Sequence, residues 1–430
     1  MRLLMFLSLV ASHLLSPASE FPPASQLPNR PGLPDPLLRP DGTTLQSTSD
    51  WPAQRGFLKQ LLATYQYGHM PERPDPASVA LEITSEKTIG DGTAELIHFT
   101  ITLHRNNRSL PVRAALLKPA TTGSEKLPTI VKNAPFLFDY ETVSDPRKRK
   151  RYQKQNHLES ELRVLRQATD RGYLVCKFLR SDAAGDAAPN PTGDVFGLYP
   201  ENKDWRVISA WAWTGSVIAD TLIRHFHADP TKLVATGHSR GGKSALCQGI
   251  YDERIAITAP NASGSGGAGS WRYFTPGGAR QTPSTFARQN PRWFTPRLYE
   301  FTGELVGHLP FDSHTMKALI APRHLINTQA SDDSLANPRG TQFTFQAAQK
   351  IFGWLGVPEN QALHWRPGGH QQAAPDWIAL LDFADSVFFA KPLADPKKFQ
   401  HLPLPDEAPE TAPPPPPTSD PRPPTPDPRP

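Results

Sequence analysis

The segment 237–243, Gly-His-Ser-Arg-Gly-Gly-Lys, constrains the fold of this chain more than any other stretch. It follows the apolar run 233–236 and precedes the helical pattern 244–250, so it predicts a strand, a tight turn and a helix. Residues 237–241 match G-x-S-x-G, a turn that exposes a serine where a strand meets a helix. The helix N-terminus would direct N–H groups toward an oxyanion forming beside Ser239. The pattern alone also fits an ordinary glycine-rich turn, so its context decides.

The context is an alternation of short apolar runs with helical patterns from residue 127 onward. Strands are expected at 128–131, 173–179, 255–258, 324–327 and 363–365, with helices at 158–168 and 207–226. Three earlier strand-like runs lie at 79–83, 94–103 and 112–117, after a helical pattern at 57–65. This order predicts an α/β protein with a mostly parallel central sheet, helices on both faces and an antiparallel N-terminal edge.

Sheets of this kind carry chemistry at the carboxyl ends of their strands, and two further loops qualify. Asp332 and Asp333 follow the strand 324–327, and His370 follows the strand 363–365. A serine nucleophile needs a base and a carboxylate that orients the base, and in the α/β-hydrolase fold they occur in the order Ser, Asp, His. We therefore predict a triad of Ser239, His370 and one of the two aspartates, with a turn role for the other aspartate.

The termini differ in composition from the centre of the chain. Arg2, an apolar stretch at 3–15 and the small residues after it predict a cleaved signal peptide at 1–18, and hence a secreted or periplasmic protein. An uncleaved anchor is the alternative, but the stretch is shorter than the ~18 residues that span a bilayer. We expect an extended N-terminal segment at 19–50, the catalytic domain at 51–392 and a disordered Pro-rich tail at 393–430.

Charge and cysteine content narrow the choice of partners. The net charge of +5 is small for 430 residues, and the basic run 147–151 fits a solvated loop better than a site for nucleic acid or an acidic polymer. Cys176 and Cys247 are expected in the core, although a disulfide between them is an alternative. We expect no metal, no cofactor, no nucleic acid and, after cleavage of the signal, no membrane contact.

Beyond these patterns, the chain resembles a known family. Residues 237–272, GHSRGGKSALCQGIYDERIAITAPNASGSGGAGSWR, resemble the glucuronoyl esterases of carbohydrate esterase family 15. The likeness continues at 309–314, 318–323 and 366–370, with earlier matches at 67–71 and 211–213. It implies a secreted serine esterase that cleaves the ester between 4-O-methylglucuronic acid on xylan and lignin alcohols through an acyl-Ser239 intermediate. Separately, we expect a monomer.

The resemblance also implies roles for individual residues. Ser239 would be the nucleophile and His370 the base. Arg240 would hold the oxyanion through its backbone N–H and its guanidinium, and Lys243 would hydrogen-bond the sugar hydroxyls. Two cations beside Ser239 agree with this assignment, because they stabilise developing negative charge and suit an acidic sugar. The alternative is that either cation is simply paired with a carboxylate.

The chain departs from the family pattern around the acid and the sugar. Ala262 stands where many fungal members carry a glutamate, whereas Asp333 aligns with the acid of some bacterial members, which favours Asp333 with Asp332 in reserve. Leu335 occupies the position of an aromatic residue expected to touch the sugar. The further substrate-binding candidates are Gln281, Gln289 and Arg272, of which Gln289 replaces a glutamate.

These departures affect the expected substrate more than the reaction. An acetyl or feruloyl esterase acting on plant polysaccharide therefore remains an alternative. A carbohydrate-binding pseudoenzyme that lost its acid at Ala262 is another.

Overall fold

The computed structural model describes residues 21–400, apart from 31, 122, 144, 155, 191 and 192, together with 402, 404, 410 and 411. The predicted signal peptide and most of the Pro-rich tail lie outside the described residues. Within the described part of the chain, no helix is long and apolar enough to cross a bilayer.

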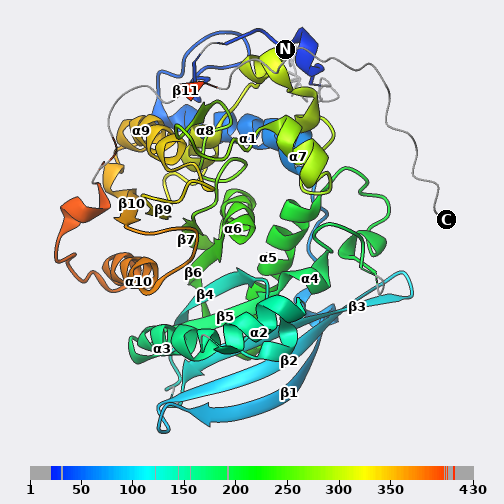
Figure 1. Ribbon diagram of the computed structural model, residues 1–430, viewed down its shortest axis with the longest axis vertical. Coiled ribbons are helices and arrows are strands. Elements are labelled where there is room, and N and C mark those ends of the chain that lie inside the picture. Colours follow the sequence, from blue (N-terminus) through cyan, green and yellow to red (C-terminus); the bar gives the residue numbers. More distant parts are fainter. Residues whose placement is uncertain are drawn as a thin grey trace, which may run out of the picture.

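The chain folds around a nine-stranded sheet in the order β1-β2-β3-β5-β4-β6-β7-β9-β10 (Figure 1). The strands are β1 (Ala80–Ile89), β2 (Ala94–Arg105), β3 (Arg108–Pro119), β4 (Leu127–Ala134), β5 (Leu174–Leu179), β6 (Ala228–His238), β7 (Ile255–Asn261), β9 (His324–Ala330) and β10 (Gln361–Arg366). The pairs from β1 to β5 along this order are antiparallel, and those from β5 to β10 are parallel. The predicted α/β-hydrolase fold with an antiparallel N-terminal edge is confirmed.

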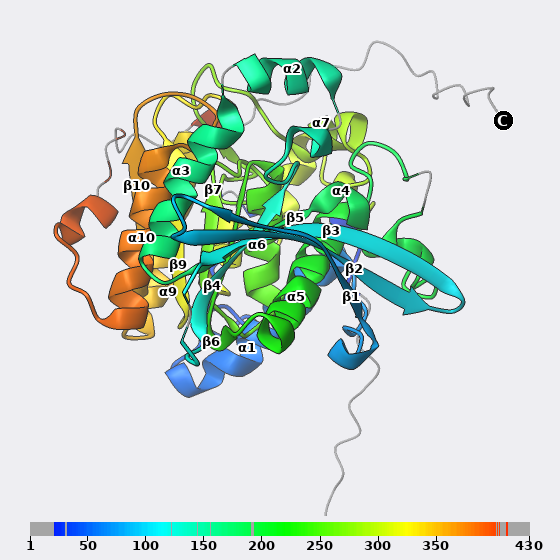
Figure 2. The ribbon, with the colours of Figure 1, turned by 90° about the horizontal axis from the view of Figure 1, so that it is seen from below.

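Helices cover both faces of the sheet (Figure 2). The first face carries α1 (Trp51–Leu62), α5 (Val207–His225), α6 (Arg240–Tyr251) and α9 (Pro338–Trp354), and the second carries α3 (His157–Asp170) and α10 (Ala374–Phe389). Shorter helices are α2 (Pro146–Lys154), α4 (Arg180–Ala183), α7 (Pro283–Gln289) and α8 (Ser313–Ala318). Alternate strand residues feed one apolar core on each face, as the period of two along a strand requires.

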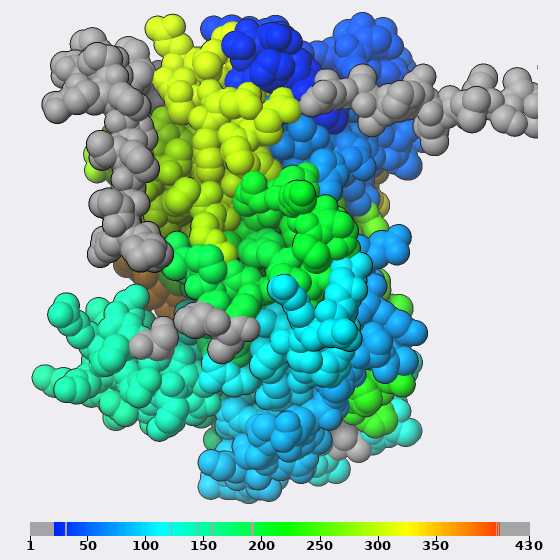
Figure 3. Space-filling model, turned by 90° about the vertical axis from the view of Figure 1, so that its right-hand side faces the viewer, coloured from blue at the N-terminus to red at the C-terminus, as the bar shows by residue number. Residues whose placement is uncertain are grey.

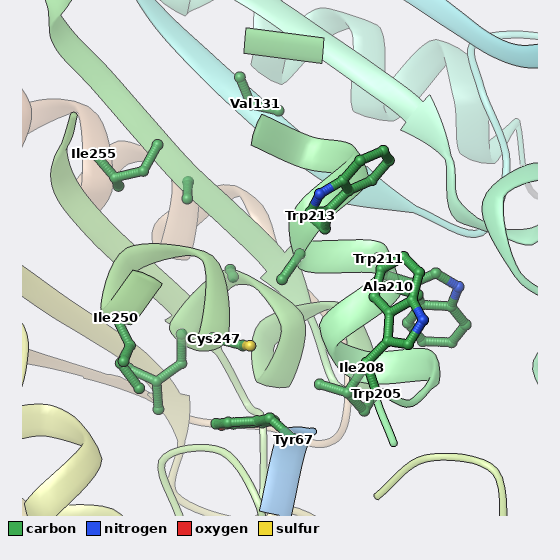
Figure 4. Packing of buried hydrophobic residues seen from close by; sticks show 14 of the residues in the cluster. Tyr67, Val131, Trp205, Ile208, Ala210, Trp211, Trp213, Cys247, Ile250 and Ile255 are labelled. Atoms are coloured by element: carbon green, nitrogen blue, oxygen red, sulfur yellow. The ribbon is translucent and has the colours of Figure 1, made fainter. Parts of the chain in front are cut away.

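The core under α5 and α6 holds large aromatic side chains and both cysteines. Figure 4 shows Trp211 and Trp213 of α5 near Trp205, with Cys247 and Ile250 on α6. Cys176 and Cys247 are both buried and free, so the alternative of a disulfide between them is wrong. Rigid packing around α5 and α6 fixes the turn that precedes α6.

The segment that precedes α1 contains little regular structure, but it packs closely on the domain. Ala24 and Leu45 are buried. The Tyr65 hydroxyl donates a hydrogen bond to the Pro22 carbonyl at 2.5 Å, and Arg297 Nη2 donates one to the Phe21 carbonyl at 2.9 Å. The extended segment is therefore attached to the domain by long-range contacts that no local pattern indicated.

The packed domain also extends past residue 392, the expected end of the catalytic domain. Phe399 is buried, and Gln342 Nε2 donates a hydrogen bond to the Leu404 carbonyl at 3.0 Å. A short strand β11 (Glu410–Thr411) pairs with β8 (Tyr273–Phe274). The described part of the tail is thus ordered against the domain, unlike the disordered tail expected from residue 393.

Candidate active site

The turn between β6 and α6 has the geometry of a nucleophile elbow. Ser239 adopts φ 56° and ψ −119°, a conformation that L-residues rarely occupy. A Cβ on Gly237 would lie 2.5 Å from the carbonyl carbon of Gly241, and one on Gly241 would lie 2.9 Å from the Asn133 carbonyl oxygen. Both positions need glycine because backbone approaches backbone there. The predicted strand, turn and helix are confirmed.

Three loops at the carboxyl edge of the sheet bring a hydroxyl, an imidazole and a carboxylate together. His370 Nε2 lies 2.9 Å from Ser239 Oγ, and His370 Nδ1 lies 2.8 Å from Asp333 Oδ2. Asp333 is 1% exposed, whereas the His370 side chain is 26% exposed. The buried carboxylate can therefore hold the imidazole while its other nitrogen faces Ser239 and solvent.

The two neighbouring aspartates have different contacts. Asp333 Oδ1 accepts hydrogen bonds from the N–H groups of Leu335 and Ala336 at 3.1 and 3.2 Å, which leaves Oδ2 for the imidazole. Asp332 is exposed, and its Oδ2 accepts a hydrogen bond from the Gly368 N–H at 2.8 Å. The structure brings Asp333 to His370, while Asp332 braces the loop that carries His370.

A second histidine, His238, lies against His370, and sequence reasoning assigned it no role. The two ring centroids are 4.5 Å apart, and His238 Nδ1 is 2.6 Å from Asn261 Oδ1. The Asn261 amide nitrogen donates to Thr328 Oγ1 at 2.8 Å, so its oxygen faces His238 as an acceptor. Burial, reinforced by repulsion from His370, lowers the pKa of His238 to about 3. His238 is therefore neutral at pH 7 and leaves proton transfer to His370.

Arg240, the residue after the nucleophile, is held by two residues from distant loops. Its guanidinium forms an ion pair with Asp186 and lies 5.0 Å over the Trp293 ring. Trp293 Nε1 donates a hydrogen bond to the same carboxylate at 2.7 Å. Helix α6 begins at Arg240, so the N–H groups of its first turn lack intrahelical acceptors. Asp186 and Trp293 lie in loops without periodicity, and no sequence signal pointed to them.

Lys243 is a buried cation without a counterion. It is 2% exposed, and its Nζ donates to the carbonyls of Ser263 and Ser265 at 2.5 and 2.6 Å. Among the described residues, no carboxylate forms an ion pair with it. Burial, together with the nearby Arg240 charge, lowers the pKa of Lys243 to about 7. Arg240 is thus paired, as the alternative interpretation had it, and Lys243 is not.

Gln281 shares the surroundings of Lys243. A Cβ built on Gly264 would lie 2.4 Å from Gln281 Oε1 and 3.5 Å from Lys243 Nζ, so both groups lie against the same face of that glycine. Gln281 Oε1 is buried, and no described residue donates a hydrogen bond to it. An acceptor without a described donor and a cation without a described carboxylate partner therefore stand side by side, as in a polar binding site.

The other two substrate-binding candidates lie in different surroundings. Gln289 is exposed at the last residue of α7. Arg272 is buried and donates to Asp312 Oδ2 at 3.2 Å, to the Phe311 carbonyl at 2.9 Å and to the Leu309 carbonyl. These are the contacts of a structural ion pair, so Arg272 is no longer a substrate-binding candidate.

The departures from the family pattern have visible structural counterparts. Ala262 is buried with φ 42°, and its N–H donates to the Thr328 carbonyl at 3.0 Å. Leu335, beside Asp333, is 49% exposed and presents an aliphatic surface to solvent. Across the described residues, no group of three or more His, Cys, Asp or Glu side chains is arranged to hold a metal ion.

Comparison with known proteins assigns the family. A sequence model of the fungal glucuronyl esterases matches residues 161–356. A carbohydrate esterase family 15 glucuronoyl esterase of known structure, from Caldicellulosiruptor kristjansonii, is 30% identical to this chain. The match covers 88% of this chain and 96% of that protein, with a TM-score of 0.67. The chain belongs to carbohydrate esterase family 15.

A 4-O-methyl-glucuronoyl methylesterase from Phanerochaete carnosa is 29% identical over 336 residues, or 76% of this chain and 73% of the relative. The family 15 glucuronoyl esterase structure from Teredinibacter turnerae, at 24% identity and a TM-score of 0.71 over 83% of this chain and 89% of its own, shares the fold. The resemblance found in the sequence is confirmed at the level of the family, which is one of carboxylic ester hydrolases.

Proposed function

We propose that this family 15 member is a serine esterase that hydrolyses esters of 4-O-methylglucuronic acid, including those joining xylan to lignin alcohols. The observation that carries the proposal is the unbroken set of hydrogen bonds from Asp333 through His370 to Ser239. The name of the Phanerochaete carnosa relative, a 4-O-methyl-glucuronoyl methylesterase, supports the choice of acid.

The reaction follows from the contacts of these side chains. Ser239 Oγ attacks the ester carbonyl as His370 Nε2 takes its proton, and Asp333 stabilises the resulting imidazolium through Nδ1–H. The N–H of Arg240 and its guanidinium stabilise the oxyanion. His370 then protonates the departing alcohol. A water molecule then attacks the acyl-enzyme while His370 takes its proton. The proton returns to Ser239 Oγ, and glucuronate is released.

Lys243 and Gln281 are suited to hold the sugar. Lys243 Nζ and Gln281 Oε1 offer a donor and an acceptor against the same face of Gly264, and sugar hydroxyls can use both. Positive charge on Lys243 also attracts the acid formed in the reaction. Gln289, exposed on α7, would contribute only at the outer edge of such a site.

The decisive measurement compares two ester types. We expect turnover of benzyl glucuronate by the wild-type chain and none by Ser239→Ala, with little activity on acetylated xylan. Activity on the acetyl ester alone would reject the glucuronoyl assignment while leaving the serine mechanism intact.

An acetyl or feruloyl esterase is the second candidate, and Leu335 is the observation that favours it. An exposed aliphatic side chain stands where a ring was expected to touch the sugar, which weakens selection for a glucuronoyl group. A feruloyl ester added to the same panel tests this candidate. Labelling of Ser239 by a fluorophosphonate would exclude the pseudoenzyme alternative.

The cellular location and the assembly state belong to the proposal as well. We infer secretion or export to the periplasm after cleavage near residue 18, and function as a monomer without a cofactor. N-terminal sequencing of the mature protein and its mass in solution test both statements. An intact N-terminus on the exported protein would contradict the predicted cleavage.

A further inference from the structure

The basic run of the sequence forms a helix with one strongly charged face. Arg147, Lys150, Arg151 and Lys154 stand at positions i, i+3, i+4 and i+7 of α2, so they share one side of the helix. All four are exposed. We call these four residues the basic face of α2. Four cations on one side of a nine-residue helix make a concentrated positive surface.

The charge on this face is largely unbalanced, although Asp145 lies just before the helix and accepts a hydrogen bond from the N–H of Arg147. No acidic residue lies within α2, and no described carboxylate forms an ion pair with any of the four cations. The neighbouring Arg149 points elsewhere, because its Nη2 donates to the Val143 carbonyl at 2.9 Å and anchors the helix. Like charges at these spacings repel one another and weaken the helix. The basic face is therefore unfavourable for the free protein.

The helix stands at the same edge of the sheet as the catalytic site. Strand β4 ends at Ala134, and Asn133 is in register with Gly237 of the elbow. Two residues beyond that end, the Phe136 ring lies 5.3 Å from the Tyr152 ring of α2. Figure 3 shows the α2–α3 region, in teal, projecting from the body. Helix α2 therefore lies beyond the same ends of the strands as Ser239.

We propose that the basic face of α2 binds the free carboxylates of an acidic polysaccharide while an esterified uronate of the same polymer reaches Ser239. The inference rests on the proposed function. An ester is neutral at the bond that is cleaved, so electrostatic attraction must act on other, unesterified uronates of the chain. Exposed, unpaired cations beside the site supply this attraction, which raises the rate of encounter and falls with added salt.

A charge-neutralised variant tests the proposal. The variant replaces the basic face: Arg147→Gln, Lys150→Gln, Arg151→Gln and Lys154→Gln. It removes repulsion and keeps the Arg149 anchor, so we expect it to fold. A matched control removes four exposed cations outside α2: Lys87→Gln, Lys126→Gln, Arg224→Gln and Lys350→Gln. Both sets are made in the full chain carrying Ser239→Ala for binding, and in the active chain for kinetics.

Binding is measured on glucuronoxylan and on neutral arabinoxylan across salt concentrations. The α2 variant should bind glucuronoxylan roughly tenfold more weakly than the control and lose most of the salt dependence. In the active chain, kcat/KM on a polymer-borne ester should fall by a similar factor, while kcat/KM on benzyl glucuronate stays unchanged.

Three results would overturn the proposal. They are equal binding of the neutral and acidic polymers, an equal loss in the control variant, and tighter salt-resistant binding of single-stranded DNA than of glucuronoxylan. Failure of the proposed function looks different: the chain would bind glucuronoxylan through α2 and yet release no glucuronate from its esters. That result would support the basic face as a polyuronate site.

Discussion

Two regions of this molecule bury lysines, and they treat the charge differently. Under α3, Lys132 and Lys177 share Glu161, whose carboxylate oxygens lie 2.8 and 2.7 Å from the two ammonium groups. Beside the elbow, Lys243 donates to the carbonyls of Ser263 and Ser265 and has no carboxylate partner among the described residues. The first arrangement gives each ammonium group a carboxylate partner and needs no ligand. The second leaves the Lys243 ammonium without a carboxylate partner in the described part of the chain, as expected where a ligand binds.

A buried lysine without a carboxylate partner does not by itself indicate a binding site. Lys317 is also buried, with the Thr341 carbonyl at 2.9 Å and Thr344 Oγ1 at 2.7 Å as partners. Burial lowers its pKa well below the usual value, which favours the neutral amine. Lys243 differs because its pKa of about 7 leaves it partly charged at neutral pH, one helical turn from Ser239. We therefore expect substitutions at Ser239, Asp333 and Lys243 to lower the activity. Substitution of Glu161 should instead lower the free energy of unfolding.

The largest effect is expected for Ser239→Ala. Removing the nucleophile should lower kcat on benzyl glucuronate on the order of 10⁶-fold, as for other serine hydrolases. The melting temperature should not fall, because a small side chain at a strained turn contributes little packing. Steady-state kinetics and thermal unfolding check both statements. A variant that keeps wild-type kcat would remove Ser239 from the mechanism.

The next largest effect separates the two aspartates. Asp333→Asn should lower kcat about 10⁴-fold, because the amide cannot orient and stabilise the imidazolium. Asp332→Asn is the matched control, and it should change kcat only slightly, since its carboxylate only accepts the Gly368 N–H. The opposite ranking of the two variants would reassign the acid.

Glu161→Gln tests the structural side of the comparison. It leaves two buried ammonium groups without their shared carboxylate, so the free energy of unfolding should fall by about 3–5 kcal/mol. Among the folded molecules, kcat on benzyl glucuronate should stay near the wild-type value. Chemical denaturation gives the first quantity. A large loss of kcat without a loss of stability would show that the Glu161 cluster takes part in catalysis.

The pH dependence of stability sharpens this test. Although burial acts to raise it, the two lysines lower the pKa of Glu161 below the usual range. The stabilisation is therefore present above the unfolded pKa of about 4.3 and is lost only as the pH falls through the lower folded value. The difference in stability between the wild type and Glu161→Gln should persist at pH 4.5 and shrink in stronger acid.

The smallest effect is expected at Lys243. Lys243→Gln should lower kcat/KM on benzyl glucuronate roughly 10–100-fold, mainly through KM, because one charged hydrogen bond to the sugar is lost. As the pH rises through about 7, Lys243 loses its charge, so the wild-type KM should rise between pH 6 and 8. This rise in KM should be absent from Lys243→Gln. An identical KM profile in both would separate Lys243 from substrate binding.

Lys243 should also weaken the fold at low pH. Its folded pKa lies below the unfolded value of about 10.4, so the unfolded chain binds more protons between these values and stability rises with pH there. Lys243→Met should therefore unfold at a higher temperature than the wild type at pH 6, with a smaller difference at pH 9.

Local sequence determined the elbow, the order of strands and helices, and the loops that carry the triad. These features depend on short-range rules: glycine where backbones meet, periodicity within an element, and chemistry at the carboxyl ends of parallel strands. Even the choice of Asp333 over Asp332 came from the likeness of a short stretch to family members. The signal peptide at 1–18 remains a prediction, since it lies outside the described residues.

Only the tertiary structure decided the state of each charge. Asp186 meets Arg240 across 54 positions of sequence, and Arg272 meets Asp312 across 40. Lys243 meets no carboxylate at all among the described residues. No local pattern encodes such pairings, because burial and distance set the energy of a charge, and both depend on which loops the complete fold brings together.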